Sequence, residues 1–286
     1  SADIMIAGGM ESMTNAPHLL PKARLGYRYG HVKMLDHMAF DGLENAYDGK
    51  SMGIFADATA AKYGFTREQQ DAFATESVKR AQRAVADGSF KAEIAGVTTK
   101  GKTGDVIIDT DETPGLCRPD KIPSLKPAFN KDGTVTAATS SSISDGAAAL
   151  ILMRESEATK RGIKPIARIV GHASNAHEPE WFTTAPIGAI DKLQKKLGWT
   201  PKDVDLYEIN EAFAVVAMAA MKDLNLPHEK VNVNGGACAL GHPIGATGAR
   251  LMVTLLHALK ARNGKRGIAS LCIGGGEATA IAVEMM

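Results

Sequence analysis

The sequence predicts a mixed α/β fold in which helices cover both faces of a mixed sheet. Short apolar runs typical of strands alternate with longer runs typical of helices throughout the second half of the 286 residues. Glycines and capping residues separate these runs. Ten of the 29 glycines fall between residues 235 and 276. This concentration indicates either several tight turns or a close approach of the backbone to a ligand.

The first half of the chain begins with a strand and then leaves the sheet. The expected elements are a buried strand over 3–7 that ends in a turn at Gly8-Gly9, helices over 51–62 and 66–88, and two short strands within 97–110. Thr66 and Gln69 form a capping box at the start of the second helix, and Gly64 closes the first. Four prolines then predict about fifteen residues without regular structure: Pro114, Pro119, Pro123 and Pro127.

The second half of the chain alternates regularly between strands and helices. The expected elements are an apolar run over 147–153, strands over 166–170, 204–209, 268–272 and 278–285, and helices over 186–197, 210–224 and 245–261. Gly198 lies at the C′ position of the helix 186–197. Three consecutive glycines at 274–276 join the last two strands. This alternation is the basis of the α/β prediction.

The composition excludes several classes of protein. Hydrophobic residues make up 44% and charged residues 23%, which excludes a disordered or collagen-like chain. The formal net charge is +1, so no strong field favours nucleic acid or an anionic membrane. The longest apolar run, 212–221, is about half the ~20 residues that a membrane helix needs. Three cysteines do not make a disulfide framework and indicate a reducing compartment, either the cytoplasm or the mitochondrial matrix if a presequence was lost.

Residues 15–36 are predicted to be irregular and carry a cluster of basic side chains. The cluster consists of Lys22, Arg24, Arg28, His31 and Lys33. Basic clusters are most often solvated faces. The functional alternative is attraction of a phosphorylated, anionic ligand.

Three polar side chains lie at ends of predicted elements in the glycine-rich half. Asn210 follows the strand 204–209, His242 precedes the helix 245–261, and Cys272 ends the strand 268–272. In open α/β sheets, ligands bind at the ends of strands, so these positions suit a site. Taken singly, each has a structural explanation: Asn210 as a helix N-cap, His242 as a turn residue and Cys272 as a small buried hydrophobe.

Other kinds of site do not fit these residues. Cys238, His242 and Cys272 lack a paired C-x-x-C and an obvious fourth ligand, so zinc is disfavoured and no metal is expected. No Gly-Lys-Ser/Thr follows the glycines, which excludes a Walker phosphate loop. No G-x-G-x-x-G opens a helix after a strand, which excludes a dinucleotide fingerprint.

Considered together, five segments resemble motifs of the thiolase family. They are Gly8-Gly-Met-Glu-Ser-Met13, Thr136-Ala-Ala-Thr-Ser-Ser141, Asn210-Glu-Ala-Phe213, Asn234-Gly-Gly-Ala-Cys-Ala-Leu-Gly-His-Pro243 and Cys272-Ile-Gly-Gly-Gly276. They occur in family order, and the resemblance runs from the first residue to the last.

The resemblance implies an acyltransferase that joins or cleaves acyl chains carried on coenzyme A. Cys272 matches the family's acid/base cysteine, His242 its catalytic histidine, and Asn210 the residue that holds a water beside the substrate oxygen. The backbone N–H near Gly274 resembles part of a second oxyanion hole. A thiolate at Cys272 can remove a proton from carbon if a desolvated, glycine-lined site brings its pKa into range.

The family's second cysteine, the acyl-accepting nucleophile, has no match in these residues. It belongs to a motif upstream of the position that matches Ser1, and neither Cys117 nor Cys238 stands in such a motif. The sequence therefore resembles a thiolase that lacks the N-terminal segment bearing the nucleophile.

Substrate-binding residues also follow from the resemblance. Ser141 matches the serine that contacts the pantetheine arm, and Met52, Phe129 and Phe213 match apolar residues that line a short acyl pocket. The alternative for each is an ordinary core position. No residue clearly matches the arginine that some thiolases place beside the adenine: Pro114 stands near that place, and Arg118 is the one substitute that the sequence offers. The resemblance also favours the functional alternative for the basic stretch 22–33, in which its positive charges attract the phosphates of coenzyme A.

The implied fold is the thiolase fold, in which two related mixed-sheet α/β domains pack in layers and an inserted loop domain covers the ligand. The expected division is 1–14 and 143–165 for the N-terminal domain, 15–142 for the loop domain, and 166–286 for the C-terminal domain.

The implied function is the reversible Claisen condensation of two acetyl-CoA molecules to acetoacetyl-CoA and coenzyme A. The alternatives are a 3-ketoacyl-CoA thiolase of fatty-acid β-oxidation and a non-catalytic coenzyme A or lipid-binding relative. Coenzyme A thioesters are then substrates, with no further cofactor. A homotetramer is expected, with neither nucleic acid nor membrane as partner.

Overall fold

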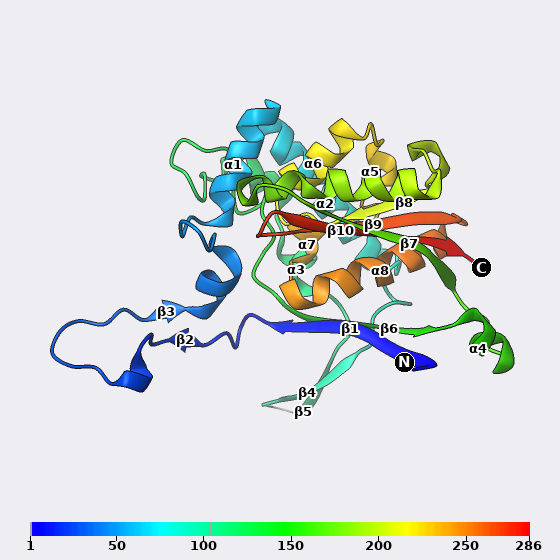
Figure 1. Ribbon diagram of the computed structural model, residues 1–286, viewed down its shortest axis with the longest axis horizontal. Helices are drawn as coiled ribbons and strands as arrows, with labels where there is room; N and C mark the ends of the chain where they lie inside the picture. Colours follow the sequence, from blue (N-terminus) through cyan, green and yellow to red (C-terminus); the bar gives the residue numbers. More distant parts are fainter. Residues whose placement is uncertain (1, 103) are drawn as a thin grey trace.

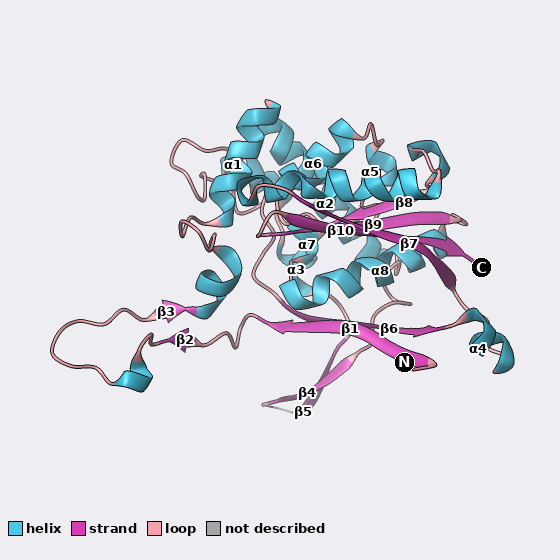
Figure 2. Ribbon diagram, viewed as in Figure 1, coloured by secondary structure: helices cyan, strands magenta, loops and turns pink. Residues whose placement is uncertain are grey.

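The computed structural model describes residues 2–102 and 104–286, so Ser1 and Thr103 lie outside the described part of the chain. The assignment of Ser1 to the N-terminal domain, and of Thr103 to the loop domain and to the region of two short strands, therefore lies outside the described residues. Figures 1 and 2 show a layered body with an extended arm at one side. From top to bottom in that view, the layers are helices, a larger sheet, a helical layer and a smaller sheet.

A four-stranded mixed sheet forms the middle of the body. Its strands lie in the order β7 (Ala167–Ala176), β10 (Glu277–Met285), β9 (Arg266–Ile273) and β8 (Leu206–Ile209). Strand β8 runs parallel to β9, and the other two pairings are antiparallel. The prediction of a mixed sheet is confirmed.

Helices cover both faces of this sheet. Helices α5 (Ala185–Leu197) and α6 (Ala214–Asp223) lie on one face, and α8 (Ile244–Ala261) lies on the other (Figure 1). The α5 helix ends at Gly198, which has φ 66°, as its C′ position requires. Tyr207 and Ile209 of β8 belong to the core on the α5 and α6 side, and Leu206 belongs to the core on the α8 side.

A second sheet lies on the other side of α8 and consists of β1 (Ile4–Ser12) and β6 (Asp145–Met153), paired antiparallel. The prediction of a turn at Gly8-Gly9 is wrong, because β1 continues through both glycines. A side chain at Gly9 would overlap the carbonyl oxygen of Gly245 at the start of α8, and one at Gly8 would overlap the carbonyl oxygen of Ala148. The glycines therefore allow close packing within a strand.

Two helices predicted from the first half are present as α1 (Met52–Tyr63) and α2 (Arg67–Ala86). The capping box is formed as expected: Gln69 N donates to Thr66 Oγ1, and Thr66 N donates to Gln69 Oε1. Gly64 closes α1 with φ 66°. Local sequence signals alone were sufficient for this pair of helices.

The proline-rich stretch is more regular than predicted. It contains the short helix α3 (Glu112–Leu116) and the 3₁₀ segment η3 (Pro119–Ser124). Pro114 occupies the first turn of α3, where a backbone N–H would have no partner within the helix. The prediction that these prolines exclude regular structure is therefore wrong.

The remaining elements are short. They are β2 (His18–Leu19), η1 (Ala23–Leu25), β3 (Leu35–Asp36), the π-helical η2 (Met38–Leu43), β4 (Val97–Gly101), β5 (Gly104–Ile108), α4 (Glu155–Lys160), η4 (Pro179–Thr184), η5 (Pro201–Asp203), η6 (His228–Lys230) and α7 (Ala237–Leu240). Strands β4 and β5 are the two short strands expected within 97–110 and pair antiparallel, and β2 and β3 lie in the arm.

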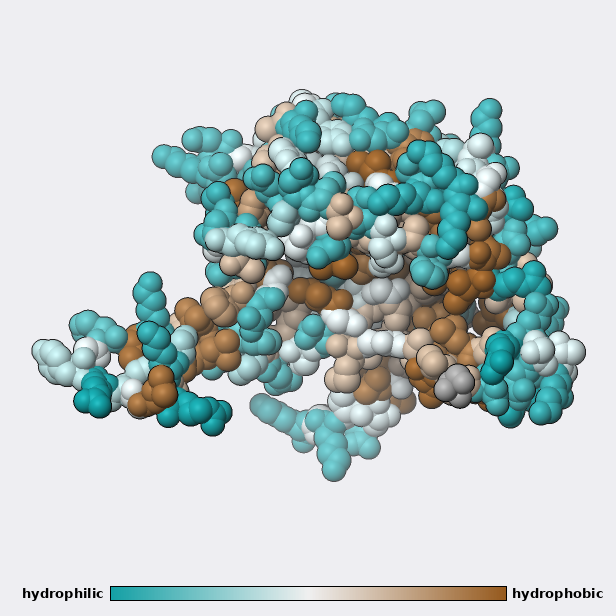
Figure 3. Space-filling model, viewed as in Figure 1, coloured by the Kyte–Doolittle hydropathy of each residue, from teal (hydrophilic) through white to brown (hydrophobic). Residues whose placement is uncertain are grey.

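One face of the β1–β6 sheet exposes apolar side chains, so the prediction of a buried strand over 3–7 is wrong. Ile6 and Ile151 are cross-strand neighbours and are 74% and 69% exposed, and Met10 is 74% exposed. Figure 3 shows hydrophobic side chains gathered along this lower edge of the body. Among the described residues, no helix is both long and apolar enough to cross a membrane.

Candidate active site

Asn210 and Cys272 are brought together by the parallel pairing of β8 and β9. Asn210 directly follows β8, and its backbone N–H donates to the carbonyl of Ser270 on β9, 3.0 Å away, two residues before Cys272. Asn210 is not a helix N-cap, because α6 begins at Ala214 and Phe213 is its N-cap. Both side chains therefore lie at the same edge of the sheet, where α/β proteins bind ligands.

His242 reaches this edge from the loop between α7 and α8. Its backbone N–H donates to the carbonyl of Ser142, 3.2 Å away. Its Nε2 lies 3.3 Å from Asn210 Nδ2, and its Nδ1 lies 2.6 Å from Thr247 Oγ1. Burial, with a smaller contribution from the positive charge of Arg250, lowers the pKa of His242 to about 4. The imidazole is therefore neutral near pH 7.

The Cys272 thiol is buried near the end of β9. Burial raises its pKa to about 12, away from the range in which a resting thiolate forms. The condition stated for Cys272 as a base is therefore not met in the resting site. Glycines line the turn, and among residues 2–102 and 104–286 no cation lowers the free-energy cost of burying a thiolate there. Cys272 is a neutral thiol at rest, and its thiolate would be a strong base.

Gly274 lies in the turn between β9 and β10. A Cβ at this position would come within 3.1 Å of Met52 Sδ, so the turn packs closely against the start of α1. Gly276 has φ 99°, and a side chain there would overlap the carbonyl oxygen of His177. The turn thus needs glycine for both its conformation and its packing.

Apolar side chains form a wall next to this turn. The ring centroids of Phe129 and Phe213 are 5.8 Å apart in an edge-to-face arrangement. Phe129 lies directly over Gly53, the residue after Met52, and both Met52 and Phe213 are buried. The structure therefore brings the three predicted pocket residues to one place.

Ser141 is held against the same segment. Its N–H and its hydroxyl both lie 3.1 Å from the carbonyl oxygen of Ala212, the residue before Phe213. Ser142, the next residue, accepts the backbone hydrogen bond of His242. Ser141 and Ser142 are thus hydrogen-bonded on one side to the Asn210–Phe213 segment and on the other to the loop that carries His242.

Two polar residues of the site were not predicted from the sequence. Thr247 contacts the His242 ring, and Glu211 is buried with its carboxylate hydrogen-bonded to Ser77, Asn232 and the backbone N–H of Cys238. Glu211 stands inside the Asn210–Phe213 segment, which was the available signal. The burial and partners of both residues depend on contacts that only the folded chain creates.

The other two cysteines have separate environments. Cys117 packs against the small cluster of Val78, Ala81 and Ala239, and the buried Cys238 thiol is directed at the carbonyl oxygen of Glu211, 3.9 Å away. Among residues 2–102 and 104–286, no three His, Cys, Asp or Glu side chains converge in the manner of a metal site.

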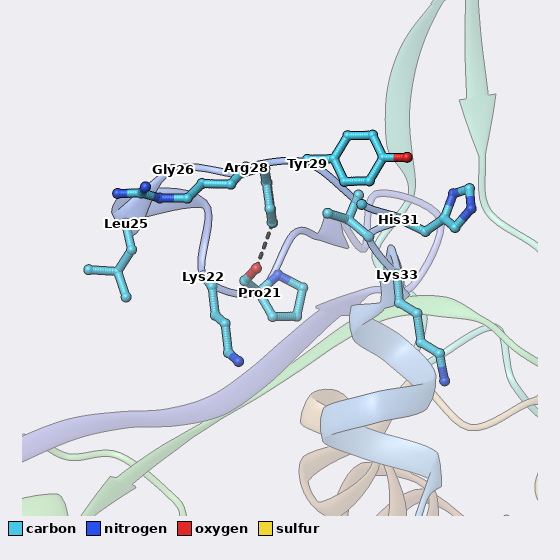
Figure 4. A pocket seen from close by; sticks show the side chains of 11 residues that line it. Pro21, Lys22, Leu25, Gly26, Arg28, Tyr29, His31 and Lys33 are labelled. Atoms are coloured by element: carbon cyan, nitrogen blue, oxygen red, sulfur yellow. Dashed lines mark hydrogen bonds between the residues drawn. The ribbon is translucent and has the colours of Figure 1, made fainter.

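The basic stretch lies on the arm rather than in the body. A pocket of about 560 Å³ lies within the bend of the arm. Figure 4 shows Lys22, Arg28, His31 and Lys33 around it. Its lining comes only from residues 21–33, and Tyr27 Oη donates to the carbonyl of Pro21 across it, 2.6 Å away. The arm extends away from the sheets that carry Asn210 and Cys272 (Figure 1).

Comparison with known proteins identifies the family. Models of the N-terminal and C-terminal domains of thiolase match residues 1–156 and 163–285. The chain belongs to the thiolase family. The resemblance seen in the motifs and the predicted thiolase fold are both confirmed.

Individual thiolases match this chain over nearly its whole length. The acetyl-CoA acetyltransferase of Chromobacterium violaceum is 50% identical over 285 residues, which are 99% of this chain and 73% of that protein. The crystal structure of the Bacillus anthracis acetyl-CoA acetyltransferase has a TM-score of 0.95 and 41% identity, covering 100% of this chain and 72% of that one. The Ascaris suum thiolase Acat5, in complex with coenzyme A, has a TM-score of 0.93 and 42% identity, covering 99% and 72%.

Proposed function

We propose that this thiolase catalyses the reversible Claisen condensation of two acetyl-CoA molecules to acetoacetyl-CoA and coenzyme A. The observation that carries the proposal is the 3.3 Å contact between Asn210 and the neutral imidazole of His242, at the end of the sheet where the neighbouring strand β9 carries the buried Cys272 thiol. The names of the acetyl-CoA acetyltransferases that it resembles support the acyl group, and the Ascaris suum complex supports coenzyme A as its carrier.

Cys272 transfers the proton to and from the substrate carbon. In the cleavage direction, its neutral thiol protonates the enolate that leaves when the carbon–carbon bond of acetoacetyl-CoA breaks. The thiolate that remains then takes the proton of the incoming coenzyme A thiol, because a group with a pKa of about 12 is a stronger base than an ordinary thiolate, whose thiol has a pKa of about 8.5. The coenzyme A thiolate attacks the acyl-enzyme, and Cys272 returns to its resting form.

His242 and Asn210 stabilise charge on the thioester oxygen. As the enolate forms, its negative charge concentrates on that oxygen. A protonated Nε2 of His242 and a water held by Asn210 would donate to it, and loss of one such donor costs roughly 3 kcal/mol of transition-state stabilisation. Asn210 Oδ1 is buried without a hydrogen-bond partner among the described residues, which leaves an acceptor for that water.

The acyl-accepting thiol is proposed to come from outside residues 1–286. Neither remaining cysteine suits the role, since Cys117 packs in the cluster with Val78 and the Cys238 thiol is directed at the carbonyl oxygen of Glu211. Burial also raises the pKa of both thiols, which disfavours the thiolate that a nucleophile needs.

The apolar wall is proposed to limit the acyl group. Met52 lies against the Gly274 turn, and the edge-to-face pair of Phe129 and Phe213 stands beside it, so a short chain fits this place best. Ser141 would contact the pantetheine arm. The backbone N–H near Gly274 would donate to the acyl-enzyme oxygen, which requires the close backbone approach that glycine permits.

A 3-ketoacyl-CoA thiolase uses the same groups and differs in its acyl pocket, so the compact wall favours the acetyl-CoA type. A coenzyme A-binding protein without activity has no need for Asn210, His242 and Cys272 together. Their convergence therefore favours an enzyme.

The test uses the natural full-length protein with Cys272→Ala. We expect labelled acetyl-CoA to acetylate the variant at the same stoichiometry as the wild type, because the acyl group is accepted elsewhere. Formation of acetoacetyl-CoA should fall by at least 100-fold, on the order of the contribution of general acid–base catalysis. Both quantities are measured on the same samples by radiolabel trapping and by product chromatography.

Cys117→Ala is the matched control, because it removes a thiol outside the site and should leave both measurements unchanged. Normal condensation by Cys272→Ala would remove Cys272 from the mechanism. A wild-type protein that binds acetyl-CoA but is never acetylated would overturn the proposed reaction.

A further inference from the structure

A fully buried hydroxyl lies beside the candidate catalytic histidine, and no step derived above uses it. Thr247 is on the first turn of α8 and has no exposed surface. Its Oγ1 is 2.6 Å from His242 Nδ1 and 2.9 Å from the carbonyl oxygen of Pro243. These two contacts specify where its single proton goes.

The carbonyl of Pro243 can only accept, so the Thr247 hydroxyl donates to it and presents a lone pair to the imidazole. The proton between Oγ1 and Nδ1 then belongs to the ring. On the other side of the ring, Nε2 faces the Nδ2 amide group of Asn210 at 3.3 Å, which is a donor. Both contacts agree on one tautomer, with Nδ1 protonated and Nε2 carrying the lone pair.

We propose that Thr247 is a positioning residue that holds His242 in the Nδ1–H tautomer, so that Nε2 enters the reaction as a proton acceptor. This inference rests on the proposed acyl transfer for its chemical consequence, although the tautomer itself does not. Catalytic nucleophiles are often activated by a base that a third residue orients. Here His242 is the base, and the neutral hydroxyl of Thr247 is the orienting group.

The consequence concerns the step that loads the acyl group. The proton of the nucleophilic thiol passes to Nε2, and the electron pair left on sulfur forms the new carbon–sulfur bond. The carbonyl π pair moves onto oxygen and returns when the coenzyme A sulfur leaves with its bonding pair. After this transfer His242 carries protons on both nitrogens, and its Nε2–H becomes the donor that the thioester oxygen needs. The histidine thus acquires its donor proton from the nucleophilic thiol during acyl transfer.

A purely structural role would look different. A threonine hydroxyl that bonds the carbonyl four residues earlier is a common local contact in helices. That carbonyl also accepts from the backbone N–H groups of Ala246 and Thr247 at 2.9 and 3.0 Å, so the first turn of α8 does not depend on the hydroxyl. A structural role therefore predicts a small change in stability and no change in the histidine tautomer.

The experiment uses the natural full-length protein labelled with ¹⁵N-histidine, and reads the protonated ring nitrogen of His242 by NMR. The His242 signals are assigned by comparison with His242→Asn. We expect the wild type to carry its proton on Nδ1. In Thr247→Val, which keeps the shape and removes the hydroxyl, we expect the proton to move to Nε2, wholly or in part, because Nδ1–H loses its acceptor.

Kinetics supply the second readout. For Thr247→Val, we expect the rate of acetyl-enzyme formation at saturating acetyl-CoA to fall about 10- to 100-fold, since a misprotonated base contributes less to proton transfer. KM should change less than twofold, because Thr247 contacts Nδ1 of the His242 ring and not Nε2, the nitrogen that takes part in the reaction. Thr247→Ser should restore both the tautomer and the rate to within threefold of the wild type.

Thr254→Val is the matched control. Thr254 is another buried threonine of α8, and its hydroxyl donates to Glu93 Oε1, 3.0 Å away. Its loss should leave the His242 spectrum and the acylation rate unchanged.

A wild-type proton on Nε2, or a Thr247→Val variant with an unchanged tautomer and rate, would overturn the inference. If Thr247→Val does not fold, the wild-type spectrum and Thr247→Ser still decide it. If the wild type shows no acyl transfer, the proposed function fails, whereas the NMR result still tests the tautomer.

Discussion

Glu211 shows how a buried charge organises the residues around the candidate site. It follows Asn210, has almost no exposed surface, and faces three donors: Ser77 Oγ at 2.7 Å, Asn232 Nδ2 at 2.8 Å and the backbone N–H of Cys238 at 3.1 Å. Burial raises the pKa of this carboxyl, and the three hydrogen bonds oppose that shift. The carboxylate therefore links Ser77 of α2, the loop that contains Asn232, and Cys238 of α7 through hydrogen bonds.

We predict that Glu211→Gln lowers the free energy of unfolding by about 1–3 kcal/mol, because the amide places an N–H₂ group against a donor in a buried site. Urea denaturation of the natural full-length protein measures this change. The exposed Glu229→Gln is the control and should stay within about 0.5 kcal/mol of the wild type. An unchanged urea midpoint for Glu211→Gln would show that the three donors do not need a carboxylate.

For individual residues, the sequence predicted the site residues that stand in recognisable motifs but not the residues that contact them. Asn210, His242 and Cys272 stand at element ends within recognisable segments, so their meeting could be expected. Thr247 lies five residues after His242, and its contact with the ring depends on the bend between α7 and α8. The pKa of Cys272 depends on how completely the thiol is buried, which the sequence does not show.

Glycine packing decides how two elements approach each other near the site. Strand β1 crosses the start of α8 where Gly9 meets Gly245, three residues after His242. Neither glycine presents a side chain, so the backbones come into direct contact. The sequence predicted a turn at Gly8-Gly9 because local patterns do not reveal which element packs against a strand.

We predict that Gly9→Ala destabilises the protein by at least about 2 kcal/mol, since the added methyl meets a backbone carbonyl that cannot move without shifting α8. Thermal unfolding followed by circular dichroism gives the measurement. Gly115→Ala is the control, because no atom lies within 4 Å of a Cβ built there and its φ is not positive. Equal melting temperatures for the two variants would contradict the close approach.

Most elements were predictable because their signals are local. The capping box of α2, Gly64 after α1 and Gly198 after α5 each stop or start a helix through their own backbone chemistry. The helix expected from Asn210 begins four residues later, at Ala214. There the Ser140–Ser141 segment pairs with the chain around Ala212 and Phe213 and keeps it extended, which is a tertiary effect.

For the whole molecule, helix α8 is the layer shared by both sheets. It contacts β8 and β9 on one side and β1 and β6 on the other, so it couples the four-stranded sheet to the two-stranded one. The outer face of β1 and β6 has no such cover within the described residues. Ile4, Ile6 and Met10 lie on one face of β1, and Ile151 is the cross-strand neighbour of Ile6.

The last prediction concerns residues 1–286 produced alone. We expect this polypeptide to self-associate, because a two-stranded sheet with an exposed apolar face and open edges favours pairing between copies. Light scattering coupled to size-exclusion chromatography should give a mass above the 30.2 kDa of one chain. The same preparation should not convert acetyl-CoA, since the acyl-accepting thiol is proposed to lie outside it.

The double variant Ile6→Gln/Ile151→Gln tests the cause, since both side chains are exposed neighbours on that face. It should shift the mass toward that of a monomer and leave the circular dichroism spectrum unchanged. Ile163→Gln, an exposed isoleucine outside the β1–β6 sheet, should not have this effect. A monomeric, cooperatively folded and active wild-type polypeptide would instead place the nucleophile within residues 1–286. Cys238 would then be the first residue to substitute, because it lies four residues from His242 and is hydrogen-bonded to the residue after Asn210.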